Sequence, residues 1–215
     1  MIEIVSLVLG PVDTNVYLIA DPQSGEAVVI DPAWDGRLIT AEAEKRGWRI
    51  TKIWVTHGHF DHFAGATAII EGIKPAPAVA LHPGDLPLWQ MQGGAPFFGM
   101  RIDPVPDPNI PLSHGQTLKL GATRFEVRHA PGHTPGHVVF YCHDEKLVFC
   151  GDVIFMSGIG RTDLPGGSFL TLMRSIQAQI LSLPDDTRLL SGHGPETTVG
   201  EERKENPFLT DRFIG

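Results

Sequence analysis

The stretch V-T-H-G-H-F-D-H at residues 55–62 constrains the fold of this chain more than any other part of its sequence. Three histidines and one aspartate lie within six positions, directly after an apolar run. His57 and His59 alternate, so an extended backbone would point both side chains to one face. Nitrogen and oxygen donors crowded in this way suit a borderline divalent metal, and no cysteine lies among them. The stretch is therefore a candidate metal-binding segment whose donors are His57, His59, Asp61 and His62.

Three further β-rich runs end in residues of the same kind. F-E-V-R-H-A-P-G-H ends at His133, L-V-F-C-G-D ends at Asp152, and R-L-L-S-G-H ends at His193. The carboxyl ends of strands are where open α/β sheets gather their functional loops. We therefore expect these three residues to meet the 57–62 segment in one site, instead of being scattered over surface and core.

Local patterns predict a chain of short strands with helices between them. Strands are predicted, from β-rich runs bounded by turn residues, at 2–8, 15–20, 27–30, 52–56, 78–81, 117–120, 123–129, 137–142, 147–150 and 188–191. One helix is predicted from Asp35, as its N-cap, to Gly47, and another from Ser168 to the residue before Pro184. Sheets with helices packed outside them form a layered α/β domain. No hydrophilic linker divides the sequence, so we expect one domain over residues 1–215.

Composition narrows the classes of partner. A content of 42% hydrophobic and 20% charged residues is typical of a soluble globular protein. The net charge of −8 argues against nucleic acid and against anionic membranes, both of which require a basic surface. No run is long enough to span a bilayer, and the start has no basic segment before its apolar stretch, so a cytoplasmic protein is expected.

The two cysteines are expected to be packed, reduced thiols, since two are too few for a disulfide framework. They flank a hairpin turn at residues 143–146, and folding about that turn sets Cys142 opposite Leu147 and Cys150 opposite Val139. The two thiols are therefore not expected to meet.

Residues 82–111 contain seven prolines and show no clean period. Such a long irregular segment in a compact domain is usually functional or mobile. Its apolar side chains could cover an active site or merely anchor the segment to the core, and both readings stay open. These side chains are Trp89, Met91, Phe97, Phe98 and Met100.

The motifs H-G-H-F-D-H, P-G-H-T-P-G-H, G-D-V-I-F and G-H-G-P, in this order and spacing, resemble the metallo-β-lactamase superfamily. The resemblance extends from residue 1 to about residue 210. Within the superfamily, G-R-T-D-L-P-G-G at 160–167 and E-R-K-E-N-P-F-L at 202–209 are most similar to glyoxalase II-like (hydroxyacylglutathione hydrolase-like) proteins of the short bacterial single-domain group. The resemblance implies an α/β fold, the four-layer αββα sandwich, with a metal site at one edge of its two sheets.

The resemblance also implies a cofactor of two divalent metal ions, with zinc expected first and iron or manganese as alternatives. One metal would be bound by His57, His59 and His133, and the second by Asp61, His62 and His193, with Asp152 bridging both. Asp152 and Asp61 would be catalytic, and Asp61 would also orient the attacking hydroxide. Four further histidines match no ligand position and are predicted to be structural or surface residues: His82, His114, His129 and His143.

Three other positions have two interpretations each. His137 either hydrogen-bonds and orients a ligand, as the resemblance implies, or packs at the start of a strand. Asp31 either supports the 57–62 segment from behind or starts a turn before Pro32. Arg161 stands where longer family members carry a basic glutathione-binding residue, so its planar fork could pair with a substrate carboxylate. Alternatively it forms a local salt bridge to Asp163, which replaces a tyrosine of those enzymes.

The function implied is hydrolysis of a small-molecule thioester by a metal-bound hydroxide, with S-lactoylglutathione as the leading substrate. Only 22 residues follow His193, too few for the helical domain that contacts glutathione in longer members, so another thiol carrier stays possible. The main alternative is a persulfide dioxygenase, an oxidoreductase of the same fold, with one iron held by His57, His133 and Asp152. A non-catalytic metal-binding module is the third reading.

Overall fold

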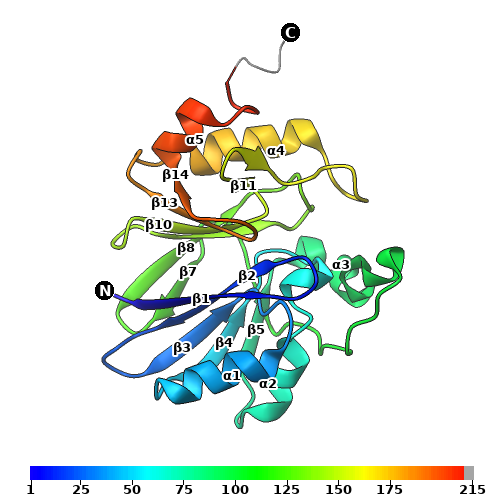
Figure 1. Ribbon diagram of the computed structural model, residues 1–215, viewed down its shortest axis with the longest axis vertical. Helices are drawn as coiled ribbons and strands as arrows, with labels where there is room; N and C mark the ends of the chain where they lie inside the picture. Colours follow the sequence, from blue (N-terminus) through cyan, green and yellow to red (C-terminus); the bar gives the residue numbers. More distant parts are fainter. Residues whose placement is uncertain (211–215) are drawn as a thin grey trace.

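The computed structural model describes residues 1–210, and within them two sheets face each other with helices outside each sheet (Figure 1). The first six-stranded sheet has the order β1 (Glu3–Leu9), β2 (Thr14–Ala20), β3 (Glu26–Ile30), β4 (Arg49–Trp54), β5 (Ala78–Leu81) and β6 (Ile110–Pro111). The second has the order β14 (Thr197–Thr198), β13 (Arg188–Ser191), β10 (Leu147–Gly151), β9 (Val138–Cys142), β8 (Thr123–His129) and β7 (Thr117–Leu120). A small hairpin joins β11 (Ile154–Phe155) to β12 (Gly158–Ile159).

The helices complete four layers. The first sheet is covered by α1 (Gly36–Lys45) and α2 (Ala66–Gly72), and the second by α4 (Phe169–Ser175) and α5 (Val199–Glu205) (Figure 1). The short helix α3 (Leu86–Gln90) lies to one side. Between the sheets, Trp54 packs against Phe125 and Phe140, with ring centroids 5.1 and 5.4 Å away. The predicted αββα sandwich is confirmed.

Strand direction explains why functional loops gather at one edge. In the first sheet β3, β4, β5 and β6 are parallel, and in the second β10 is parallel to β13. Asp31 follows β3, the 57–62 segment follows β4, and Asp152 and His193 follow β10 and β13. Because parallel strands end at the same edge of their sheet, these residues are brought to one place.

Most predicted elements are present with shifts of a few residues. All ten predicted strands overlap observed ones, and the strands that the sequence did not reveal, β6, β11, β12 and β14, have two residues each. Gly47 follows α1 with a φ of 71°, as a C-terminal glycine should. Ser168 caps α4 by accepting a hydrogen bond from the Thr171 N–H, and the chain continues as a π-helical turn at Ile176–Ile180, before Pro184. The predicted domain extends to residue 215, so its last five residues lie outside the described range.

One capping prediction is wrong. Asp35 precedes α1, but its side chain makes no capping hydrogen bond. Its φ of 46° is left-handed, whereas a side chain caps a helix from the extended region. The first residue, Gly36, instead lies so close to the carbonyl oxygen of Gly65 that a Cβ there would be 2.2 Å away. The start of α1 is therefore fixed by its packing near α2.

The cysteine prediction is confirmed within the described residues. Cys142 pairs with Leu147 across the β9–β10 hairpin, and both Cys142 and Cys150 are buried free thiols. In the same part of the chain, no helix is long and apolar enough to cross a membrane.

The 82–111 segment is more ordered than its composition indicated. It contains 3₁₀ turns at Pro83–Asp85 and Gln92–Phe98 as well as α3 and β6. Trp89 is buried and stacks on Phe63, with centroids 3.9 Å apart, whereas Met91, Phe97 and Phe98 are exposed. The segment is thus anchored to the core through Trp89, while Met91, Phe97 and Phe98 keep much of their surface accessible to solvent.

Candidate metal centre

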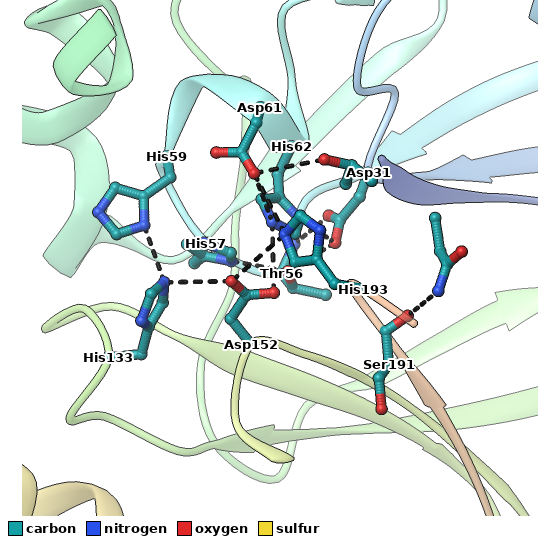
Figure 2. Close-up of polar contacts among 12 residues, drawn as sticks. Asp31, Thr56, His57, His59, Asp61, His62, His133, Asp152, Ser191 and His193 are labelled. Carbon is teal, nitrogen blue, oxygen red and sulfur yellow. Dashed lines mark hydrogen bonds and ion pairs between the residues drawn. The ribbon is translucent and has the colours of Figure 1, made fainter. Parts of the chain in front are cut away.

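The 57–62 segment follows β4 after a bend at Thr56 and His57, is extended at His59, and then makes a 3₁₀ turn at Phe60–His62. His57 and His62 are fully buried, and His59 is nearly so. His57 and His59 point toward the second sheet, and the 3₁₀ turn brings Asp61 and His62 beside them (Figure 2). One short segment therefore supplies four donor side chains.

The second sheet supplies the other three predicted donors, His133, Asp152 and His193 (Figure 2). His133 Nε2 lies 2.9 Å from His59 Nδ1, and the Asp152 carboxylate lies 3.5 Å from His133 and 3.4 Å from His62. His193 Nε2 is 3.3 Å from Asp61 Oδ2 and 3.6 Å from Asp152 Oδ2. Asp152 thus lies between the two predicted sets of donors.

All seven predicted donors gather into three overlapping groups. In each group, one donor atom from every member lies within 4.8 Å of the others. The groups are His57, His59 and His133; His57, His62 and Asp152; and Asp61, His62 and His193. The first and third are the two sets inferred from the motifs, and the second connects them through Asp152.

Unpaired polar atoms test whether these residues fit a cation. His57 Nε2, His62 Nε2 and Asp152 Oδ1 are buried, and none has a hydrogen-bond partner among residues 1–210. His62 Nε2 and Asp152 Oδ1 are close, 3.4 Å apart, but do not meet hydrogen-bond geometry. Buried polar atoms without partners are costly, and their convergence on one place is what a metal ion relieves. The donor set therefore fits divalent metal.

The electrostatics of the centre also suit metal ligation. Burial, reinforced by His62, holds the pKa of His57 well below its usual range, and burial with His133 lowers the pKa of His59 to about 3. Burial would likewise lower the pKa of His62, but the charges of Asp61 and Asp152 outweigh it and raise that pKa. The neutral histidines have lone pairs available, and a metal can replace a proton held by His62.

Asp31 lies behind the segment, as one of its two interpretations predicted. Its carboxylate accepts hydrogen bonds from the Thr56 N–H and hydroxyl, both at 2.7 Å, and lies 2.9 Å from His62 Nδ1. The Thr56 hydroxyl is also 3.0 Å from His57 Nδ1. With Nδ1 engaged, Nε2 of each ring is left to face the centre. Asp31 therefore orients two of the donor histidines.

His137 contacts the bridging aspartate through the backbone. Its Nε2 accepts a hydrogen bond from the Asp152 N–H at 3.0 Å, and its ring stacks on His57 at 4.7 Å with 17° between the planes. Burial holds the pKa of His137 well below its usual range, so the ring is neutral and can accept. The ring is therefore both packed at the strand start and hydrogen-bonded beside a donor.

Arg161 is engaged locally. Its guanidinium pairs with the Asp163 carboxylate through two hydrogen bonds of 2.8 and 2.7 Å, and both side chains are largely exposed. The salt bridge is the second of its two interpretations. The backbone carbonyl oxygen of Arg161 accepts a hydrogen bond of 2.7 Å from His133 Nδ1, a contact that the sequence did not indicate.

Asp85 is the residue that sequence analysis missed. It is fully buried and accepts hydrogen bonds from the Gly58 N–H at 2.8 Å, the Thr134 hydroxyl at 2.6 Å and the Gly136 N–H at 2.5 Å. Burial raises its pKa, although these hydrogen bonds oppose the rise. The carboxylate thus connects the loop of His57 to the loop of His133. In sequence, H-P-G-D resembles an ordinary turn, and nothing local indicates this contact.

Comparison with known proteins decides the family. A sequence model described as the metallo-beta-lactamase superfamily matches residues 9–193. The chain belongs to the metallo-β-lactamase superfamily. The four structural layers and the clustered donors agree with that membership.

Three similar proteins illustrate its range. The hydroxyacylglutathione hydrolase GloC of Haemophilus influenzae is 35% identical over 92% of this chain and 93% of its own. Crystal structures of the B3 metallo-beta-lactamase BLEG-1 and of TTHA1623 in a di-iron-bound form superpose with TM-scores of 0.89 and 0.87. They are 36% and 39% identical, cover 98% and 95% of this chain, and are matched over all of their own. The chain is accordingly a metallo-hydrolase of this superfamily.

Proposed function

We propose that the chain hydrolyses thioesters with two bound divalent metal ions, and that S-lactoylglutathione is a substrate. The observation that carries the proposal is the gathering of seven donor side chains in one place, where buried polar atoms of His57, His62 and Asp152 lack partners within residues 1–210. Similarity to GloC supports a glutathione thioester, and similarity to the di-iron form of TTHA1623 supports a site for two metals, with iron as one candidate beside zinc and manganese.

In this proposal the two outer donor groups each hold one metal. His57, His59 and His133 would hold the first, and Asp61, His62 and His193 the second. Asp152 would bridge them. Two metals in such a site lower the pKa of a water molecule and polarise a carbonyl oxygen.

The chain's own residues orient the reactants. Asp61 is held ionised because His62 and His193 lower its pKa more than burial raises it, and its carboxylate accepts a hydrogen bond from Thr14 at 3.3 Å. An ionised carboxylate at this place would accept a proton of the attacking water and align it. Asp152 would be kept in its bridging position by His137. Thioester cleavage then needs no strong general acid from the protein, since a thiolate leaves readily.

Arg161 is the proposed contact for a carboxylate of the thiol carrier. Its guanidinium lies at the surface beside the loop that holds His133, and it already pairs with the Asp163 carboxylate. A substrate carboxylate would replace that of Asp163, and breaking such an exposed ion pair costs little free energy.

The alternative function, a persulfide dioxygenase with one iron on His57, His133 and Asp152, uses only part of this cluster. It leaves Asp61, His62 and His193 without a task, although their donor atoms lie within 4.8 Å of one another. This second donor group favours the hydrolase over the oxidoreductase.

The test is hydrolysis of S-lactoylglutathione by metal-analysed protein in the absence of oxygen. We expect thioester loss that disappears in Asp152→Asn and persists in Asp144→Asn, an exposed aspartate of the β9–β10 turn. Protein that holds one iron and consumes oxygen with a persulfide would identify the oxidoreductase instead. Two bound metals without turnover of this compound would reject glutathione as the carrier.

A further inference from the structure

An apolar cavity of about 340 Å³ adjoins the proposed metal centre, and His59 forms part of its wall. The rest of the wall comes from Gly84, from α3 and the following Met91, from the 92–98 turns, from Pro135 and from residues 164–166. Within residues 1–210, no charged residue lines the cavity, and apart from His59 its side chains are apolar. The larger apolar side chains of the wall are those of Leu88, Met91, Phe97, Phe98 and Leu164. This volume lies at the lower end of the range for small-molecule sites, and an apolar cavity of this size suits a small apolar group.

Three of these side chains are unusually exposed for their size. Met91, Phe97 and Phe98 have 54%, 67% and 47% of their surface accessible, and all three come from one short segment. Single exposed apolar residues are common, but a group of them around a cavity marks a binding surface. The same segment shows no such exposure at Trp89, which is buried.

The cavity is preformed because its wall is attached to the donor segment itself. Phe98 packs on Phe60, with centroids 5.8 Å apart, and Phe60 lies between His59 and Asp61. Gly93 approaches the same segment so closely that a Cβ would lie 2.2 Å from the Phe60 nitrogen. The 92–98 turns are therefore held against the residues that supply the metal donors, and the cavity stays in register with them.

These features deepen the proposed function, on which the following inference rests. We infer that the cavity binds the acyl group of the thioester, and that the preferred acyl group is aliphatic or aromatic and larger than 2-hydroxypropanoyl. Soluble thiol carriers such as glutathione bear charges, and burying a charge in this cavity without a partner is prohibitively costly. The acyl chain is the part of such a substrate that can be wholly apolar.

His59 belongs both to the cavity wall and to the donor set, so an acyl group bound in the cavity would hold its carbonyl next to the donor residues. With the acyl chain in the cavity, its carbonyl carbon lies beside the donor groups and the thiol carrier extends toward solvent. Water then adds to that carbon, the carbon–sulfur bond breaks, and the products are the carboxylic acid and the free thiol. Lactoyl has only two carbons beyond its carbonyl and a hydroxyl on the first, so it leaves most of the cavity unfilled.

The decisive experiment is a series of N-acetylcysteamine thioesters from acetyl to hexanoyl, with kcat/KM measured on the metal-loaded protein. Each methylene that enters the cavity should raise kcat/KM about fourfold, the equivalent of about 0.8 kcal/mol, until the cavity is filled. Lengthening the thiol side with the acetyl group fixed should give no comparable gain. The double variant Phe97→Ala, Phe98→Ala and the isosteric variant Met91→Gln should both flatten the acyl series.

Phe169→Ala is the matched control, because Phe169 is a phenylalanine of similar exposure (48%) on α4 and does not line the cavity. It should retain the full acyl dependence. Binding of the product acid supplies a readout independent of turnover: hexanoate should bind more tightly than acetate or lactate, with a negative heat-capacity change.

The outcomes separate the two proposals. A flat acyl series, or a gain found only on the thiol side, would overturn the acyl cavity while leaving thioester hydrolysis intact. Absence of turnover with every thioester would reject the proposed function, and the hexanoate measurement would then decide the cavity alone. Equal binding of hexanoate and acetate would overturn the inference.

Discussion

Replacing Asp85 by asparagine tests whether a buried carboxylate outside the donor set holds the centre together. An asparagine oxygen in the position of Oδ2 can still accept from Gly58 and Thr134, but its NH₂ group then faces the Gly136 N–H. One hydrogen bond is lost, and a buried donor is left without a partner, at about 1–3 kcal/mol. The hydrogen bonds from Gly58 and Thr134 also become weaker, because an amide oxygen lacks the charge of a carboxylate. Relief from burying a charge offsets part of this, so we expect the free energy of unfolding to fall by about 2 kcal/mol.

The assay is denaturant unfolding of the metal-loaded protein, accompanied by chelator competition for metal affinity. A loss of about 2 kcal/mol should lower the Tm by roughly 4–8 °C for a chain of this length. Metal affinity should fall about 10- to 100-fold, as happens when groups that orient ligands are removed. Asp144→Asn, at an exposed site, should change neither quantity. If Asp85→Asn leaves stability and metal affinity at the level of that control, the carboxylate does not connect the two loops.

Two further perturbations probe the surroundings of the centre. Gly132→Ala is expected to cost more than about 3 kcal/mol, since φ is +134° and the new Cβ would lie 2.2 Å from the Leu172 nitrogen. Gly47→Ala, also at positive φ but with no atom of residues 1–210, its chain neighbours aside, within 4 Å of the new Cβ, should cost only about 1–2 kcal/mol, and similar losses in the two variants would refute the steric argument. Burial raises the pKa of Cys150 to about 12, so the protonated thiol should resist alkylation in the native state at pH 8–9 and react once urea unfolds the chain. Rapid native-state labelling of Cys150, followed by mass spectrometry, would contradict that burial.

The sequence predicted those parts of the site that follow from strand order. His57, His133, Asp152 and His193 each follow a β-rich run, and the parallel arrangement of strands places their ends together. Asp85 escaped prediction because its partners lie 27 to 51 residues away and its local sequence is that of a turn. The capping role assigned to Asp35 failed for a related reason, since packing near α2 overrides the local preference.

Each sheet supplies only part of the donor set, and this couples the metal to the fold. The first sheet presents His57, His59, Asp61 and His62, and the second presents His133, Asp152 and His193. A cation at this edge therefore joins the sheets at a place where the apolar core between them gives way to polar side chains. Without a cation, the buried polar atoms of His57, His62 and Asp152 lack hydrogen-bond partners within residues 1–210. With a cation bound, the binding free energy adds to the stability of the sheet pair. Asp31 contacts Thr56 and His62 on the first sheet's side, and Asp85 connects the loop of His57 to the loop of His133. The two carboxylates therefore position the donor residues for a metal. We conclude that metal affinity and global stability should fall together in variants of Asp85, whereas variants of the exposed wall of the apolar cavity should change both very little.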